Sequence, residues 1–452
     1  MTKLTIIGSG SMVFTRRIVT DLLLMEEFSE MEISLMDIDP ERLRISELIV
    51  KAIANEIGVK PNITSHTDRK TALKGADFVQ TPILTGGYSS TKIDFNIPEK
   101  YGLKQTIADT VGIGGIMKGI RTLPVLLDIA KDILETCPNA IWLQSANPMA
   151  MTIMAISKKF PEANVVGLCH SVPNTAMMLA NDIGEKIDDI VFKCAGINHM
   201  SFYLSFEKKL PDGSTEDLYP KLKAIAASIV NGEKKSSRTL QQSKHGKFMS
   251  EKVRYEMLIR LGYFVTESSE HFSEYVPWFI KNNNPELISK YKIPLGDLID
   301  RDEYKQNQLE GYAATLKNES RLETFESNEY ATQIIRSVAN NYPIEINGNV
   351  MNNGLIDNLP DDCCVEVPCT VDKNGISPQR IGTLPIQLAA IINTNVNVQQ
   401  LTVEAVLTNK KEYVYHAAML DPHTAAELSI NQIYDMIDEL FEAHGEILPK
   451  LK

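Results

Sequence analysis

Short apolar runs alternate with longer stretches of helical periodicity through the first two hundred residues. Leu4–Ile7 is apolar and rich in β-branched residues, and Val13–Leu24 behind it repeats apolar residues at helical spacing. Further strand-like runs lie at 33–36, 76–81, 141–144, 165–168 and 191–195. Strands that alternate with helices are typical of a parallel sheet covered by helices. We therefore expect residues 1–195 to form a doubly wound, Rossmann-like α/β domain.

Beyond His199 this alternation gives way to mixed patterns. Ser201–Phe206 has the pattern of a strand, Asp212-Gly213 favours a hairpin turn, and the apolar spacing through 430–441 predicts a final amphipathic helix. The segment 229–246 is rich in Lys, Ser and Gln, and we expect a loop there. Residues 196–452 are thus predicted to form a second, mixed α+β domain.

The stretch 255–278 holds an unusual density of titratable and aromatic side chains. Its members are Tyr255, Tyr263, Glu267, Glu270, His271, Glu274, Tyr275 and Trp278. Such a concentration is typical of a pocket for a sugar or another polyol. A solvated helix face would also account for most of the glutamates, and the pattern alone leaves both interpretations open.

The composition is that of an ordinary globular protein. The chain has 452 residues, of which 43% are hydrophobic, which suffices for two domains that share one core. A formal net charge of −12 argues against nucleic acid or another polyanion as a partner. We find no pattern of a secretory leader and no apolar run of membrane-spanning length, so we expect a cytoplasmic protein with no membrane partner.

The six cysteines are sparse for a chain of this length. They form no disulfide framework, and we expect reduced thiols. Cys363, Cys364 and Cys369 superficially resemble half of a zinc site, but the apolar residues around them favour a buried strand.

A glycine-rich turn follows the first predicted strand. Gly8 would permit a tight turn, and Gly10 with Ser11 would bring backbone N–H groups toward a phosphate at the start of the next helix. Strand, glycine turn and helix are the context of a dinucleotide site. The third glycine of the usual fingerprint is missing, since Val13 or Phe14 stands there, and an ordinary turn is the alternative.

Acidic and glycine residues at the next strand ends strengthen the dinucleotide interpretation. Asp37 ends the second predicted strand, where a carboxylate can accept hydrogen bonds from ribose hydroxyls, which favours NAD over its phosphorylated relative. Asp39 precedes a proline and a helical pattern, so we interpret it as a helix cap. Gly86 follows the strand at 76–81 and is expected to border the cofactor.

Polar side chains also follow the later predicted strands. Asn147 comes after the strand at 141–144, Cys169 after 165–168 and His199 after 191–195. Asp109 lies in a glycine-rich loop that could cover cofactor or substrate or could be a plain connector. Counting Gly8, Asp37 and Gly86, we expect six strand ends to meet at one crevice of the sheet.

Cys169 and His199 could share one metal ion. Their separation in sequence is not that of a zinc finger, and by spacing alone a buried thiol and a hydrogen-bonded histidine are the simpler reading. A divalent ion beside a nicotinamide, however, can bind substrate hydroxyls and stabilise an enediolate. Thiolate and imidazole suit softer ions whereas substrate oxygens and water suit manganese, so the ion stays ambiguous.

Several motifs together resemble one known family, the NAD- and metal-dependent glycosidases of glycoside hydrolase family four, and within it the branch of bacterial α-galactosidases. The resemblance spans nearly the whole chain. Its motifs are Gly8-Ser9-Gly10-Ser11, Met36-Asp37-Ile38-Asp39-Pro40, Gln105-Thr106-Ile107-Ala108-Asp109-Thr110, Asn147-Pro148-Met149-Ala150, Gly167-Leu168-Cys169-His170-Ser171-Val172, Ala195-Gly196-Ile197-Asn198-His199-Met200, Gly262-Tyr263-Phe264-Val265-Thr266-Glu267-Ser268-Ser269-Glu270-His271 and Tyr415-His416-Ala417-Ala418-Met419.

In this family the tetrapeptide that begins with the ligand cysteine tracks the substrate class. Members that cleave phosphosugars carry Cys-Asp-Met-Pro or Cys-Asn-Val-Pro, whereas Cys-His-Ser-Val, found here at 169–172, is associated with unphosphorylated α-galactosides. The resemblance therefore implies hydrolysis of terminal α-galactosides of the melibiose and raffinose type. It also implies a homodimer or homotetramer.

The resemblance implies a role for each candidate site residue. Cys169 and His199 would ligate Mn²⁺, with other divalent ions possible, while Asn147 and Asp109 would bind substrate. His170 would occupy the place of the acid in phosphosugar members and could also bind substrate. The family's proton-abstracting base is a tyrosine, for which Tyr255 is the first candidate and Tyr263 the second.

The implied reaction is redox-assisted hydrolysis, an exception to the two-carboxylate scheme of most glycosidases. NAD would remove a hydride from C3, a base would take the acidified C2 proton, the leaving alcohol would be expelled, water would add to C1, and the hydride would return. The alternatives are α-glucosidase or α-uronidase specificity in the same family, a 2-hydroxy acid dehydrogenase on the same cofactor fold, and a non-catalytic NAD-sensing protein.

Overall fold

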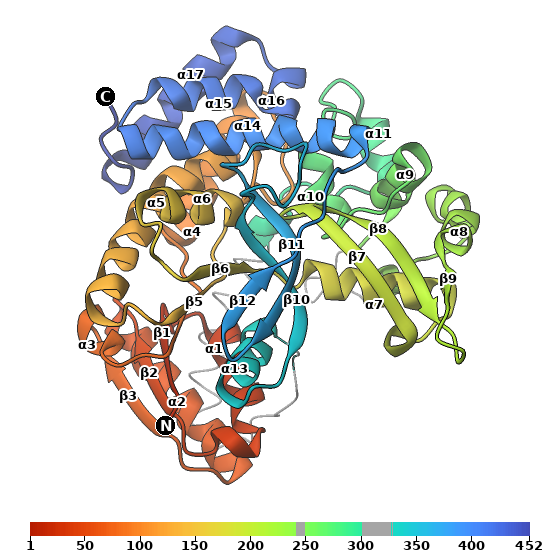
Figure 1. Cartoon of the computed structure of the whole chain (residues 1–452). Coiled ribbons are helices and arrows are strands. Elements are labelled where there is room, and N and C mark those ends of the chain that lie inside the picture. The colour runs from red at the N-terminus through yellow and green to blue at the C-terminus, as the bar shows by residue number, and fades with distance from the viewer. Residues whose placement is uncertain (241–248, 301–326, 328) are drawn as a thin grey trace.

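The computed structural model describes residues 1–240, 249–300, 327 and 329–452, and its N-terminal part is the predicted doubly wound sheet (Figure 1). The strands of this part all pair in parallel, in the spatial order β3-β2-β1-β4-β5-β6. They are β1 (Lys3–Ile7), β2 (Glu32–Met36), β3 (Asn62–His66), β4 (Phe78–Thr81), β5 (Ile141–Gln144) and β6 (Val165–Leu168). The order reverses between β1 and β4, where such sheets bind their ligands.

The strand before His199 differs from the prediction. β7 (Ile190–Ile197) lies outside the parallel part and pairs antiparallel with β8 (Met200–Lys209). The sixth parallel strand is instead β3, whose sequence Asn62–His66 is polar and partly exposed and so lacks an apolar signal. Its position at the edge of the parallel part explains why polar residues are tolerated there.

The same sheet continues into the C-terminal half of the chain. β6 pairs antiparallel with β10 (Ile344–Met351), which leads through β11 (Cys364–Asp372) to β7, β8 and β9 (Thr215–Asp217). β12 (Gly375–Pro378) pairs with β11. Cys364 and Cys369 are buried in β11, with Cys363 buried directly before it, which confirms the strand interpretation, and all six thiols are free. The sheet is thus continuous across residue 195.

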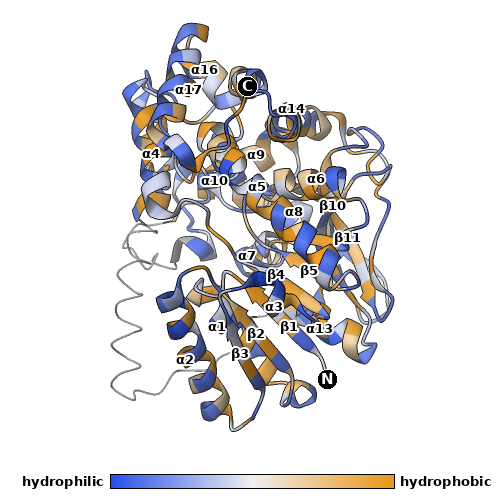
Figure 2. Ribbon diagram, turned by 90° about the vertical axis from the view of Figure 1, so that its left-hand side faces the viewer, coloured by the Kyte–Doolittle hydropathy of each residue, from blue (hydrophilic) through white to orange (hydrophobic). Residues whose placement is uncertain are grey.

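Helices cover the parallel strands, whose inner residues are largely orange in the hydropathy view of Figure 2. These helices are α1 (Met12–Leu23), α2 (Pro40–Ile57), α3 (Arg69–Leu73), α4 (Gly87–Lys100), α5 (Gly112–Thr136), α6 (Met149–Lys159) and α7 (Ser171–Ile183). Asp39 caps α2, because its side chain accepts from the backbone of Glu41 and Arg42. Ile116, Ile120 and Leu123 of α5 are fully buried, as the apolar stripe predicts.

The remaining helices of the described chain belong to the C-terminal half. They are α8 (Tyr219–Asn231), α9 (Lys252–Leu261), α10 (Ser269–Glu274), α11 (Pro285–Tyr291), α13 (Tyr330–Asn340), α14 (Ile386–Thr408), α15 (Glu412–Leu420), α16 (Pro422–Glu427) and α17 (Ile430–His444). The last four form a helical layer with α4 and α5 (Figure 1), and α17 buries Ile433, Met436 and Leu440 there as predicted.

Short turns complete the described chain. They are the 3₁₀ helices η1 (Glu26–Phe28), η2 (Ile187–Asp189), η3 (Ser237–Leu240) and η4 (Gly445–Ile447). Of the loop expected at 229–246, α8 takes the first residues and η3 a later part, while 241–248 lie outside the described residues. None of the described helices is both long and apolar enough to cross a membrane.

Candidate active site

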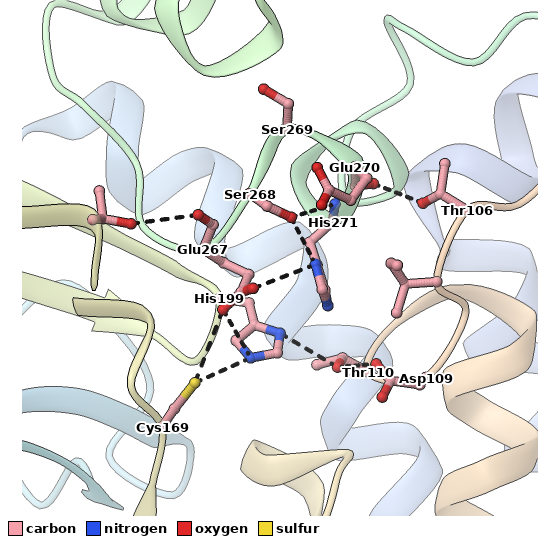
Figure 3. A network of polar contacts seen from close by, with 12 residues as sticks. Thr106, Asp109, Thr110, Cys169, His199, Glu267, Ser268, Ser269, Glu270 and His271 are labelled. Carbon is pink, nitrogen blue, oxygen red and sulfur yellow. Dashed lines mark hydrogen bonds and ion pairs between the residues drawn. The ribbon is translucent and has the colours of Figure 1, made fainter. Parts of the chain in front are cut away.

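A polar cluster of buried and half-buried side chains lies where the end of β6, the β7–β8 turn and the start of α10 meet (Figure 3). Cys169 directly follows β6, His199 forms the tight turn between β7 and β8, and Glu267 precedes α10 by two residues. The Cys169 Sγ lies 3.3 Å from His199 Nε2 and 4.0 Å from Glu267 Oε2, which is itself 3.6 Å from His199 Nε2. The structure thus brings the predicted metal pair together and adds a carboxylate.

Two members of this cluster have left-handed backbone conformations. The φ angles are 63° at His199 and 67° at Glu267, and Ala108 of the neighbouring loop has φ 50°. Such angles are uncommon for residues other than glycine and cost roughly 1–3 kcal/mol each when strained. The surrounding hydrogen bonds hold these residues in place, as is typical of functional sites.

His199 is held neutral and oriented for ligation. Burial lowers the pKa of its imidazole to about 4. Its Nδ1 lies 3.1 Å from the hydroxyl of Tyr275 and 3.4 Å from Thr110 Oγ1, which leaves Nε2 for the cluster. Partners on the second nitrogen fix the tautomer of a ligand histidine.

The charges of the other two members favour a cation between them. Burial raises the pKa of the Cys169 thiol well above its usual range, so a thiolate there requires a nearby positive charge. Burial also opposes ionisation of Glu267, but electrostatic attraction to the neighbouring groups His199, His271 and Arg238 outweighs it and lowers the pKa of that carboxyl to about 2. The donor set is therefore one that fits a divalent metal ion.

A polar shelf formed by Asp109 and Asn147 adjoins this cluster. Asp109 Oδ2 accepts from Lys118 Nζ and from Asn147 Nδ2, each at 3.2 Å, while Oδ1 accepts from Thr110 Oγ1 at 2.8 Å. Burial opposes ionisation of Asp109, yet Lys118 and the site histidines hold its pKa well below the usual range. Thr110 links the shelf to His199. An amide and a carboxylate side by side can orient sugar hydroxyls.

The loop before Asp109 is anchored on α10. The buried carboxylate of Glu274 accepts from the backbone N–H of Thr106, from Ile107 at 3.0 Å and from Ala108 at 3.0 Å. Glu270 is also buried and pairs with Arg238. These glutamates are thus not on a solvated helix face, and the part of the polar stretch from Glu267 to Tyr275 lies against the site.

His170 faces a different group from its neighbour Cys169. Its Nδ1 lies 3.3 Å from Glu329 Oε2, and the other carboxylate oxygen of Glu329 lies 3.3 Å from Arg17 Nη1. The hydrogen bond to Glu329 raises the pKa of His170. His170 and Cys169 line a pocket together with Phe14 at the start of α1.

The two tyrosines proposed as base do not reach this cluster in the described structure. Tyr255 is fully buried and donates to Asp182 at 2.6 Å, and burial together with this carboxylate raises the pKa of the phenol well above its usual value. Tyr263 packs edge-on against Tyr219. Of the described tyrosines, Tyr275 contacts His199 of the cluster, and the sequence marked it only as part of a dense polar stretch.

The glycine turn and Asp37 form a cradle that fits a dinucleotide. Gly10 N–H donates to Asp37 Oδ2 at 2.8 Å, and a Cβ at Gly10 would lie 2.6 Å from that oxygen. Ser11 is the N-cap residue of α1 but makes no side-chain capping bond, and Gly8 has φ 86°. Within the described chain the buried Ser9 hydroxyl has no hydrogen-bond partner. An uncapped helix start beside a carboxylate suits a diphosphate and its ribose.

The second strand of the switch point adds Gly86. It has φ 81° and is the N-cap residue of α4, in the loop after β4, and β4 pairs directly with β1. A Cβ at Gly86 would lie 2.2 Å from Ser90 Oγ, so only glycine fits. Gly8, Gly10, Ser11, Asp37 and Gly86 thus occupy one edge of the sheet, the edge at which β6 delivers Cys169.

Comparisons with known proteins agree with this geometry. The model of the Family 4 glycosyl hydrolase matches residues 3–185, and that of the Family 4 glycosyl hydrolase C-terminal domain matches residues 194–424. An alpha-galactosidase of Bacillus subtilis (strain 168) is 45% identical over 453 residues, covering 100% of both chains. An alpha-galactosidase of Rhizobium meliloti (strain 1021) is 33% identical, covering 99% of this chain and 89% of the relative.

A solved structure shows the same fold. The crystal structure of a 6-phospho-alpha-glucosidase from gut microorganisms, in complex with NAD and Mn²⁺, has a TM-score of 0.82 at 21% identity and covers 100% of both chains.

Proposed function

This chain belongs to the family 4 glycosyl hydrolases, and on that basis we propose that it hydrolyses terminal, unphosphorylated α-galactosides of the melibiose and raffinose type with NAD and Mn²⁺. The observation that carries the proposal is the meeting of a dinucleotide cradle and a Cys169–His199 pair at one sheet edge, since a two-carboxylate glycosidase needs neither. The sugar is assigned from the full-length likeness to an alpha-galactosidase.

The described residues divide into a cofactor cradle and a metal pair. The diphosphate of NAD would lie against Gly8, Gly10 and Ser11. Asp37 would bind the adenosine ribose, and Gly86 would border the cofactor. Cys169 and His199 would hold the divalent ion. When bound, NAD and the ion supply a transient oxidation of the sugar ring and stabilisation of the negative charge that develops beside it.

The remaining site residues bind substrate and move protons. Asn147 and Asp109 would orient the galactosyl hydroxyls, with Lys118 keeping Asp109 ionised. His170 would donate a proton to the leaving alcohol, and its bond to Glu329 favours the protonated imidazole that this role needs. Tyr255 and Tyr263 are not carried into the proposal, because the hydroxyl of Tyr255 donates to Asp182 and Tyr263 packs on Tyr219.

The charges around the pocket favour a sugar without phosphate. Glu267 lies beside Cys169, and its carboxylate is an anion that would repel a phosphate dianion. Lys118 pairs with Asp109 and Arg17 pairs with Glu329, so neither cation is offered freely to a phosphate.

A panel of nitrophenyl glycosides tests the proposal. The α-galactoside should be cleaved, and cleavage should fall to background when NAD, Mn²⁺ or thiol is omitted in turn and return when it is restored. The 6-phosphogalactoside, the α-glucoside and the α-galacturonide should be poor substrates. Preference for either of the last two would assign the chain to another specificity, which other relatives in the family have.

The rival from another class makes an opposite prediction. A 2-hydroxy acid dehydrogenase would accumulate one NADH for each product molecule. The proposed reaction recycles NAD, so the absorbance of NADH should not rise as glycoside is cleaved. The homodimer or homotetramer expected from the family resemblance stays a prediction. Light scattering on the protein as it elutes from a size-exclusion column would check it.

A further inference from the structure

We propose that Glu267 is a third protein ligand of the divalent ion, and that its carboxylate gives the site a preference for Mn²⁺ over Zn²⁺. The inference rests on the proposed function only in that a metal ion binds at Cys169 and His199. It concerns how this chain selects the ion, which the pair alone leaves open.

The three side chains have the spacing of ligands around one ion. One ligand atom from each of Cys169, His199 and Glu267 lies within 4.8 Å of the other two, and the three separations are 3.3, 3.6 and 4.0 Å. Sulfur, nitrogen and oxygen ligands bound to one ion at about 2.0–2.3 Å are separated from one another by roughly 3–4 Å. Small shifts of the side chains would therefore suffice to enclose an ion.

Backbone contacts on both sides of Glu267 hold this residue beside His199. Thr266 N donates to Ser201 O at 2.8 Å, and Phe202 and Val265 form a β-bridge, so the chain before Glu267 pairs with β8 next to the His199 turn. On its other side Ser268 caps α10 through the His271 N–H. Glu267 therefore sits between two fixed elements, with φ 67°.

Charge and hardness explain what a third ligand of this kind adds. Thiolate and carboxylate together carry two negative charges and match a dication, whose burial would otherwise be costly. Sulfur and imidazole alone favour ions such as zinc, whereas carboxylate oxygens favour manganese. Ligation by Glu267 thus shifts a soft pair toward the harder ion.

Metal titration of the full-length apoprotein, without NAD or sugar, tests the inference. Free Mn²⁺ is followed by its electron paramagnetic resonance signal, and Zn²⁺ by competition with a chromophoric chelator. Glu267→Gln should weaken Mn²⁺ binding at least about tenfold and Zn²⁺ binding distinctly less, while Glu267→Asp should recover part of the Mn²⁺ affinity. Glu256→Gln is the matched control, because among the described residues the ion pair of Glu256 is with the exposed Arg260 of its own helix.

Two further readouts separate ligation from other roles. The visible spectrum of the cobalt-substituted protein should change in Glu267→Gln and stay unchanged in Glu256→Gln. Unchanged Mn²⁺ affinity in a Glu267→Gln variant that no longer exchanges the C2 proton would overturn the inference and make Glu267 a proton acceptor. Equal loss of both ions, together with a lower melting temperature of the apoprotein, would overturn it in favour of a purely structural role.

The metal titration is independent of the sugar assignment. A wild-type protein that binds Mn²⁺ through Glu267 but cleaves no α-galactoside would refute the proposed substrate and leave the ligand set standing. If the wild-type protein cleaves α-galactosides while the Glu267→Gln variant retains full Mn²⁺ affinity and selectivity, the proposed substrate stands and the third ligand is refuted.

Discussion

Replacing Glu274 by alanine is expected to release the loop that carries Asp109 and Thr110 from helix α10. The carboxylate of Glu274 accepts three consecutive backbone N–H groups, from Thr106, Ile107 and Ala108, and all of these bonds are buried. The sharp turn they enforce includes the left-handed Ala108. Among the described residues, Glu274 is the one side chain that accepts from these three donors.

The size of the effect follows from these three bonds. Burial raises the pKa of Glu274 to about 7, so near neutral pH the carboxyl is partly protonated. Each hydrogen bond therefore contributes between about 0.5–1.5 kcal/mol (neutral) and about 1.5–3 kcal/mol (charged), while a buried donor left unsatisfied costs about 1–3 kcal/mol. Because water will reach part of the vacated space, we expect Glu274→Ala to lower the free energy of unfolding by about 3–5 kcal/mol. Glu274→Gln keeps one acceptor oxygen and should lose about 1–2 kcal/mol.

The functional effect should be selective. Displacing Asp109 by as little as an ångström misorients substrate, so kcat/KM for the α-galactoside should fall about 100-fold. The metal pair is carried by β6 and the β7–β8 turn, and Mn²⁺ affinity should therefore change far less. Urea unfolding, steady-state kinetics and Mn²⁺ titration on the same preparation measure all three.

The control for this experiment is Glu256→Gln, where an exposed partner limits the expected change in stability to about 0.5 kcal/mol. The reasoning would be refuted by a Glu274→Ala protein that stays within 1 kcal/mol of the wild type and retains its kcat/KM. Parallel loss of Mn²⁺ affinity and kcat/KM would show that α10 supports the metal pair as strongly as the loop.

Three further variants test other parts of the site. Gly10→Ala should raise the KM for NAD at least tenfold, because a Cβ would lie 2.6 Å from Asp37 Oδ2, and an unchanged KM would remove the cradle from the cofactor site. Tyr255→Phe should keep wild-type kcat and cost about 1 kcal/mol of stability, whereas loss of kcat would restore Tyr255 as the base. Glu329→Gln should return the pKa of His170, followed by NMR, toward the ordinary value of about 6.5; an unmoved pKa would show that the pair is not formed in solution.

The His170–Glu329 pair also fixes the sign of one contribution to the pH dependence of folding stability. The pKa of His170 is raised in the folded state, so the contribution of its bond to Glu329 is present below the unfolded pKa and is lost as pH rises through the folded pKa. Because the His170 side chain is 42% exposed, solvent screening keeps this contribution small.

Local sequence patterns sufficed for the parallel sheet and for the residues at its strand ends. Apolar runs marked β1, β2, β4, β5 and β6, and the polar residue that follows a buried strand must emerge at the carboxyl edge. Asn147 and Cys169 could be placed in this way. β3 could not, because its polar residues carry no apolar signal at the edge of the parallel part.

The rest of the site depends on contacts between distant segments. Glu267 meets Cys169 because residues 264–266 pair with β8, and Tyr275 meets His199 across 76 positions. Neither contact leaves a local pattern. The polar density of 255–278 pointed to the segment but not to the tyrosine that faces the metal pair. The position of the Tyr255 hydroxyl depends on its contact with Asp182 of α7, which lies far away in the sequence.

The measurement that tests the central claim most directly is hydrolysis of an α-galactoside in D₂O, with the released galactose analysed by NMR for deuterium at C2. A hydrolysis that passes through oxidation at C3 must open the C2–H bond to solvent, so the account predicts deuterium at C2 of the product, dependent on NAD and Mn²⁺. Galactose released at the full rate with only hydrogen at C2 would contradict it.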